Sequence, residues 1–295
     1  MTSPAPRQTS VGLSLAHSPD ADDAFMWWAL TGVIPLPAWS PASCSNIRIV
    51  MNDIESLNHA AQQQTFDITA ISAACYPHIC DAYAITSCGA SFGEHYGPRL
   101  VAREAMTLDA LVESDCDIAV PGTHTTAALV TALMLGCSPD RLVAIDFQEI
   151  IPAIARGDVQ AGVVIHEGQL TFGKADLHLI ADVGKWWGSQ TGLPLPLGLN
   201  VIRRSLPERD QIAGLLRWSI EQAHINREDA LRYALGFARD VTFAEADEFV
   251  KMYVNPLTLD CGSRGRDAIT ELLRRGSAAG LIPACGAIDI IHAGE

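Results

Sequence analysis

Alternation of short apolar runs with polar turns and helical segments is the feature that most limits the folds open to this chain of 295 residues. Each run is followed by a polar loop and then by a segment with helical periodicity. The clearest runs lie at 11–16, 47–51, 67–71, 117–120 and 161–165. Strands that alternate with helices in this way favour mostly parallel sheets covered on both faces. The predicted fold class is therefore α/β.

Polar side chains gather in the loops that follow several of these runs. They include Ser18, Ser72, the segment 123–126 and His166. In open α/β sheets, ligands bind beyond the carboxyl ends of the strands. Because these loops come from two successive sets of strands and helices, they predict one cleft between two lobes. The predicted function is binding of a small organic anion, with acid/base chemistry at the same place.

The charge balance argues against large anionic partners. The chain carries 34 acidic and 20 basic residues, a formal net charge of -14, and no Lys/Arg run reverses it locally. No stretch approaches the roughly 20 apolar residues of a membrane span, and the N-terminus lacks the apolar region of a signal peptide. We therefore expect no nucleic-acid partner, no membrane partner and a cytoplasmic location.

His166, which directly follows the run 161–165, is the leading candidate for catalysis. Imidazole is suited to proton transfer near neutral pH, and Glu167, next to His166, is placed to orient it. The zinc-protease pattern H-E-x-x-H needs a second histidine where this chain has Leu170, so no metal is predicted there. The alternative, a buried histidine bonded only to the backbone, stays open.

The segment PGTHTT, residues 121–126, follows another predicted strand and begins a helix. Hydroxyls and free backbone N–H groups at such a helix start can hold a carboxylate or a phosphate. An ordinary helix cap is the alternative. Neither a P-loop nor the G-x-G-x-x-G pattern occurs, so no nucleotide cofactor is predicted.

The first helix is expected to begin in the segment SPDADD. Ser18 suits the N-cap and Pro19 the first helical position. Asp20, Asp22 and Asp23 would then lie in the first turn, where carboxylates interact favourably with the helix dipole.

Seven segments, in order along most of the chain, resemble the 1,4-dihydroxy-6-naphthoate synthase family of the futalosine route to menaquinone. They are SPDADDAFMWWAL, ISAACY, GASFGEHYGPRLVAR, VPGTHTTAAL, VVIHEGQLTF, WWGSQTGLPLPLG and YVNPLTLD. The resemblance implies a two-lobed type II periplasmic-binding-protein-like fold, with a ligand cleft between the lobes. Two crossing strands, at 99–103 and 198–204, would join lobe I (1–102 plus 203–295) to lobe II (103–202).

The same resemblance implies an activity. The family acts as a carbon-carbon lyase that converts cyclic dehypoxanthine futalosine to 1,4-dihydroxy-6-naphthoate without metal or organic cofactor. His166 aligns with its general base. Thr125 and Thr126 align with paired threonines at the substrate carboxylate, and Ser18 and Ser72 with hydroxyls that line the cleft. The expected partner is thus a small carboxylated substrate, and the protein is expected to be a monomer or homodimer.

Two positions depart from the family pattern and make the site more negative. Asp22 stands where the family usually has an amide, and Ala70 where a lysine is common. We expect the Asp22 carboxylate to interact with the helix N-terminus that Ser18 caps. The alternatives are that Asp22 turns away from the cleft, is held protonated, or faces the ligand.

Two other functions remain open. A non-catalytic small-anion binding protein would share the fold but would not need His166 beside its ligand. A paralogous enzyme could act on a related carboxylated substrate; the sister chorismate dehydratases share the fold but lack the motifs around His166 and Thr125.

Overall fold

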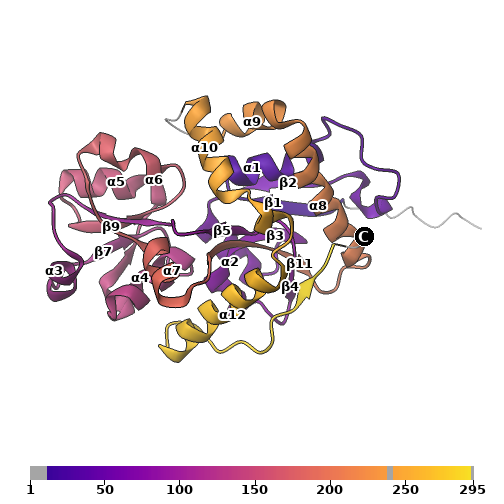
Figure 1. The fold of residues 1–295 in the computed structure, drawn as a ribbon. Coiled ribbons are helices and arrows are strands. Elements are labelled where there is room, and N and C mark those ends of the chain that lie inside the picture. Colours follow the sequence, from indigo (N-terminus) through magenta and orange to yellow (C-terminus); the bar gives the residue numbers. More distant parts are fainter. Residues whose placement is uncertain (1–11, 238–241, 294–295) are drawn as a thin grey trace, which may run out of the picture.

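The computed structural model describes residues 12–237 and 242–293, arranged as two lobes, each built around a β-sheet (Figure 1). The first residue of the predicted run 11–16 lies outside this part. The larger sheet has the strand order β12-β4-β11-β3-β1-β2, with β5 paired to β11. Its strands are β1 (Ser14–His17), β2 (Arg48–Met51), β3 (Ile68–Ser72), β4 (Tyr83–Thr86), β5 (Ser91–Gly93), β11 (Leu195–Arg203) and β12 (Ile290–Ile291).

The second sheet has the order β10-β6-β9-β7-β8. Its strands are β6 (Arg99–Ala102), β7 (Ile118–Val120), β8 (Leu142–Ala144), β9 (Ala161–Val164) and β10 (His178–Asp182). Most neighbours that follow the strand-helix alternation are parallel, whereas β6 and β11 run antiparallel to the strands beside them. The α/β class predicted from the alternation is confirmed. The expectation of mostly parallel sheets is not, because five of the described strand pairs are parallel and five are antiparallel.

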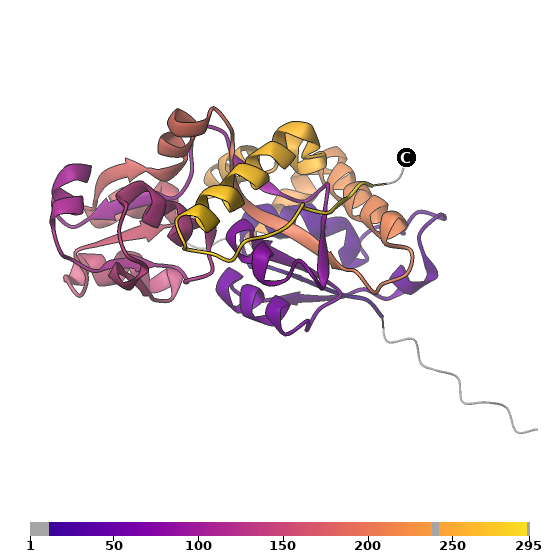
Figure 2. The same cartoon turned by 90° about the horizontal axis from the view of Figure 1, so that it is seen from below.

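Helices cover the sheets, and apolar clusters fill the space between the layers. On one side of the larger sheet, α1 packs against α8, α9 and α10, while α12 covers another part of it (Figure 2). The helices are α1 (Ala21–Trp27), α2 (Ile54–Gln62), α3 (Leu108–Glu113), α4 (Thr126–Leu135), α5 (Phe147–Arg156), α6 (Gly168–Thr171), α7 (Val183–Thr191), α8 (Arg209–Ile225), α9 (Arg227–Leu235), α10 (Phe243–Tyr253), α11 (Pro256–Leu259) and α12 (Gly262–Ala278). Short 3-10 turns, among them η3 (Ala73–His78), link some of these elements.

The two strands expected to cross between the lobes each pair within one sheet. β6 pairs with β9 and β10 in the second sheet. β11 pairs with β3, β4 and β5 in the first sheet. The apolar pattern of each segment correctly predicts a strand, but it carries no information on which sheet supplies the hydrogen bonds. The chain therefore passes between the sheets before each of these strands.

Within the described residues, no helix combines the length and hydrophobicity that crossing a membrane requires.

Candidate active site

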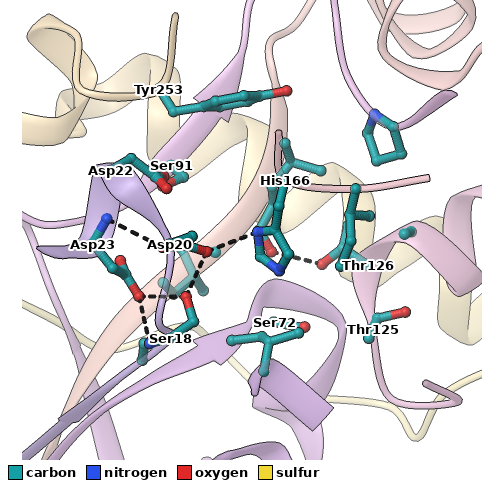
Figure 3. A pocket seen from close by; sticks show the side chains of 18 of the residues that line it. Ser18, Asp20, Asp22, Asp23, Ser72, Ser91, Thr125, Thr126, His166 and Tyr253 are labelled. Atoms are coloured by element: carbon teal, nitrogen blue, oxygen red, sulfur yellow. Dashed lines mark hydrogen bonds and ion pairs between the residues drawn. The ribbon is translucent and has the colours of Figure 1, made fainter. Parts of the chain in front are cut away.

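A cavity between the lobes brings together all five residues singled out for substrate binding or catalysis. Ser18, Ser72, Thr125, Thr126 and His166 all line it (Figure 3). About 680 Å3 of it is free of protein atoms, counting the part open to solvent. The carboxyl ends of strands from both sheets lead into this cavity, as expected for an α/β fold.

The ring of His166 is held by a carboxylate from the other lobe. His166 follows β9 in a left-handed backbone conformation, with φ of 52°, which is costly for a residue other than glycine and common at functional sites. Its Nδ1 lies 2.7 Å from Asp20 Oδ2, and Phe147 meets the ring edge-on at a centroid distance of 5.0 Å. Nε2 has no hydrogen-bond partner among the described residues, so it is the ring nitrogen available to a ligand.

Asp20, rather than Ser18, caps helix α1, which corrects the expected helix start. Asp20 has extended backbone angles, and its side chain accepts a hydrogen bond from the Asp23 N–H at 3.3 Å. Serine and aspartate are both good caps, so the local sequence does not separate these two positions. The consequence is functional, because the capping carboxylate also binds His166.

Asp20 and His166 stabilise each other's charged forms. Burial works to raise the pKa of Asp20, but the charge of His166 and hydrogen bonds from His166 and Ser18 outweigh it, and the pKa falls below its ordinary value. Burial likewise works to lower the pKa of His166, but the charge and hydrogen bond of Asp20 raise it above 6.5. The pair is suited to stabilising an imidazolium once His166 has accepted a proton.

A serine links this pair to a second carboxyl group, that of Asp23. Ser18 Oγ lies 2.6 Å from Asp20 Oδ2 and 2.8 Å from Asp23 Oδ2. One hydroxyl hydrogen serves only one of these contacts. If Ser18 donates to Asp20, a proton on Asp23 completes the other contact. Burial and the charge of Asp20 raise the pKa of Asp23 to about 7, in agreement with that arrangement.

Asp22 faces the cavity, contrary to the expectation that it would interact with the helix N-terminus. Its Oδ2 accepts a hydrogen bond from Ser91 Oγ at 3.0 Å, while Oδ1 is buried without a partner. Burial, together with the charges of Asp20 and Asp23, raises the pKa of Asp22 well above its ordinary value. The raised pKa disfavours the charged form of Asp22 and so limits the negative charge that it adds to the cleft.

Glu167 does not orient His166, as had been expected from their adjacency. Its Oε1 instead accepts a hydrogen bond from the Ala21 N–H at 3.2 Å, at the start of α1. Burial raises the pKa of Glu167, an effect that His166 partly offsets. Glu167 thus connects the loop after β9 to the first lobe, while the orienting carboxylate is Asp20.

The two threonine hydroxyls are already engaged. Thr125 caps α4: its Oγ1 accepts from the Ala128 N–H at 3.2 Å and donates to the Gly122 carbonyl at 2.7 Å. Thr126 Oγ1 donates to the Leu197 carbonyl at 2.8 Å. The N–H groups of Thr126 and Ala127, at the start of α4, have no partner among the described residues. They are the donors that this helix start offers to an anion.

Ser72 retains a free donor. Its N–H donates to Asn58 Oδ1 at 2.8 Å, and its Oγ accepts from Asn58 Nδ2 at 3.2 Å. The hydroxyl hydrogen is therefore available to a ligand in the cavity.

These hydrogen bonds predict different effects on ligand binding for two alanine variants. Ser72→Ala removes the free hydroxyl donor and should weaken binding of a small carboxylate ligand by about 0.5–1.5 kcal/mol. It should also lower stability, because Asn58 Nδ2 loses an acceptor. Thr125→Ala should lower the free energy of unfolding by about 0.5–2 kcal/mol, because it removes a helix cap. Calorimetric titration and urea denaturation of both variants test this. Unchanged affinity in Ser72→Ala, or unchanged stability in Thr125→Ala, would contradict it.

Tyr253 and Gln169, for which the sequence predicted no role, also line the cavity. Tyr253, at the end of α10, donates to Gln169 Oε1 at 2.8 Å and so joins the two lobes across the cleft. Tyr253 lies in YVNPLTLD, a segment used only for its resemblance. Two adjacent tryptophans on α7 give no aromatic surface to this cavity. Trp187 is buried and donates from Nε1 to the Pro194 carbonyl at 3.0 Å, and Trp186 packs beside the same core.

Comparison with known proteins identifies the family. A family model described as menaquinone biosynthesis matches residues 13–278. The chain belongs to this family. A relative named 1,4-dihydroxy-6-naphthoate synthase, from Streptomyces coelicolor, is 36% identical over 93% of this chain and 96% of its own. These matches are the evidence that the protein is an enzyme of menaquinone biosynthesis.

Solved structures agree on the fold. A protein from Archaeoglobus fulgidus has a TM-score of 0.84 and 38% identity, over 94% of this chain and all of its own. The alkanesulfonate-binding protein of Xanthomonas axonopodis pv. citri has a TM-score of 0.67 and 12% identity, over 96% of this chain and 98% of its own. Likeness at such low identity shows the fold alone. This protein thus has the two-lobed type II periplasmic-binding-protein-like fold, with its ligand cleft between the lobes.

Proposed function

We propose that this protein is a carbon-carbon lyase that converts cyclic dehypoxanthine futalosine to 1,4-dihydroxy-6-naphthoate, with His166 as the general base. The observation that carries the proposal is the pairing of His166 Nδ1 with Asp20 at 2.7 Å, which leaves Nε2 free in the cleft. Membership of the menaquinone biosynthesis family supports a substrate on the route to menaquinone.

In the proposed reaction, the cleft residues bind the substrate and move one proton. The free N–H groups of Thr126 and Ala127 bind the substrate carboxylate, and Ser72 donates a further hydrogen bond. Nε2 of His166 removes a proton from the substrate, so that the spiro ring opens and the sugar-derived fragment leaves. Asp20 stabilises the resulting imidazolium and holds the ring in place. No metal or organic cofactor takes part in this proposal.

A non-catalytic anion-binding protein remains the alternative, because its ligand would occupy the same cleft. The strained backbone of His166 and its paired carboxylate favour the enzyme, since simple anion binding requires neither. Action on a related carboxylated substrate is the second alternative. A cytoplasmic location, a monomeric or homodimeric state and the limits of the two lobes stay predictions.

Incubation with cyclic dehypoxanthine futalosine, followed by chromatography, tests the proposal. The expected result is 1,4-dihydroxy-6-naphthoate, formed in proportion to protein concentration. Substrate that is bound but recovered unchanged would support the binding protein. A mixture without protein is the control for spontaneous ring opening.

The raised pKa of Asp23 predicts how stability depends on pH. The folded protein keeps a proton on Asp23 up to about pH 7, whereas the unfolded chain releases it near 3.8. Between these values the folded state binds more protons, so the free energy of unfolding falls as pH rises and levels off above 7. Asp23→Asn mimics the protonated group and should flatten this slope. Urea denaturation from pH 4.5 to 8 measures it; identical slopes in both proteins would contradict the assignment.

A further inference from the structure

Outside the cleft, one carboxylate and two histidines present their ligand atoms to one another. Glu55 Oε1 lies 2.9 Å from His124 Nδ1 and 3.6 Å from His59 Nε2. The three ligand atoms lie within 4.8 Å of one another. The ring of a further histidine, His78, meets that of His124 edge-on at a centroid distance of 5.4 Å. None of these residues lines the cavity that holds His166.

The cluster joins the two lobes. Glu55 and His59 lie one turn apart on α2, which packs on the larger sheet, and His78 ends η3 beside it. His124 comes from the loop between β7, in the second sheet, and α4. A ligand held by Glu55, His59 and His124 would therefore fix this loop, which carries the start of α4, against the first lobe.

The geometry suits a metal ion of the zinc class. Tetrahedral coordination at about 2.0–2.1 Å places ligand atoms roughly 3.3 Å apart, close to the two distances from Glu55. The two imidazole ligands favour zinc, nickel or another transition metal over magnesium or calcium. Asn58 Nδ2 donates to Glu55 Oε2 at 3.1 Å and leaves Oε1 directed at the histidines. Such outer contacts orient metal ligands.

We propose that Glu55, His59 and His124 form a site for a divalent transition-metal ion that ties the two lobes together, with one position left for water or His78. The site is independent of the proposed lyase reaction. Its metal would act on the position of the 121–126 loop and not on the reacting atoms.

Titration of the full-length, untagged, reduced protein with cobalt(II), followed by visible absorption and calorimetry, tests the site. We expect one ion per chain, absorption bands typical of nitrogen and oxygen ligands, and displacement by zinc. His59→Ala and His124→Ala should each weaken binding at least tenfold. His178→Ala, which removes an exposed histidine on β10, is the matched control and should bind as the wild type does.

Three other outcomes of the cobalt titration would contradict the proposed metal site. Cobalt bound with a thiolate charge-transfer band would place the ion at cysteines and overturn the proposal. Affinity unchanged in His124→Ala would mean that the site does not join the lobes. Binding weaker than millimolar in the wild type would leave Glu55 and His124 as a simple ion pair. Circular dichroism of each variant establishes that lost binding does not reflect unfolding.

Discussion

His166→Asn is expected to lower kcat by about 10²- to 10⁴-fold, the usual contribution of a positioned acid or base. Asparagine can still donate a hydrogen bond to Asp20, so the loop after β9 should keep its position, but it cannot accept a proton near pH 7. Affinity for 1,4-dihydroxy-6-naphthoate should therefore change little. Steady-state kinetics and calorimetric titration of the same preparation separate the two effects.

His178→Asn provides the control, since His178 is exposed on β10 and is not among the residues that line the cavity. It should retain wild-type kcat. If His166→Asn loses binding and turnover to the same extent, His166 is a structural residue and the general-base assignment is wrong.

Asp20→Asn should reduce kcat/KM by about 10²-fold or more, because the paired carboxylate fixes the tautomer of the base and stabilises its charged form. It should also move the pH profile. A general base acts when deprotonated, so activity is lost as pH falls through the pKa of His166, which Asp20 raises above 6.5. Without the carboxylate that pKa falls, and the acidic limb of the profile should shift to lower pH.

Measurement of kcat/KM from pH 5 to 9 for the wild type and Asp20→Asn shows both effects. Asp53→Asn is a suitable comparison, since Asp53 also caps a helix, α2, but does not contact His166. A rate loss in Asp20→Asn with an unmoved acidic limb would mean that Asp20 acts through the helix cap alone.

The sequence predicted the fold class and the place of the cleft because both depend on local patterns. Apolar runs followed by polar loops and helical periodicity are typical of α/β sheets, and the run 161–165 correctly places His166 at a strand end. Sheet membership was less predictable. For β6 and β11 it depends on which distant strands supply the hydrogen bonds, and no local pattern records that choice.

The interactions of the site residues were less predictable than their positions. Glu167, adjacent in sequence, looked like the partner of His166, yet packing of the lobes brings Asp20 to the ring instead. The raised pKa of Asp22 depends on burial among other carboxyl groups. Both are properties of the assembled lobes, so a reading of single loops cannot reveal them.

Mass spectrometry of both products after one turnover decides whether this protein is a lyase acting on cyclic dehypoxanthine futalosine. A lyase yields 1,4-dihydroxy-6-naphthoate and one sugar-derived fragment in equal amounts, and their masses add up to that of the substrate. A fragment that carries the atoms of an added water molecule would indicate hydrolysis and contradict the lyase assignment. Substrate returned intact by wild-type protein that binds it would contradict the enzyme itself.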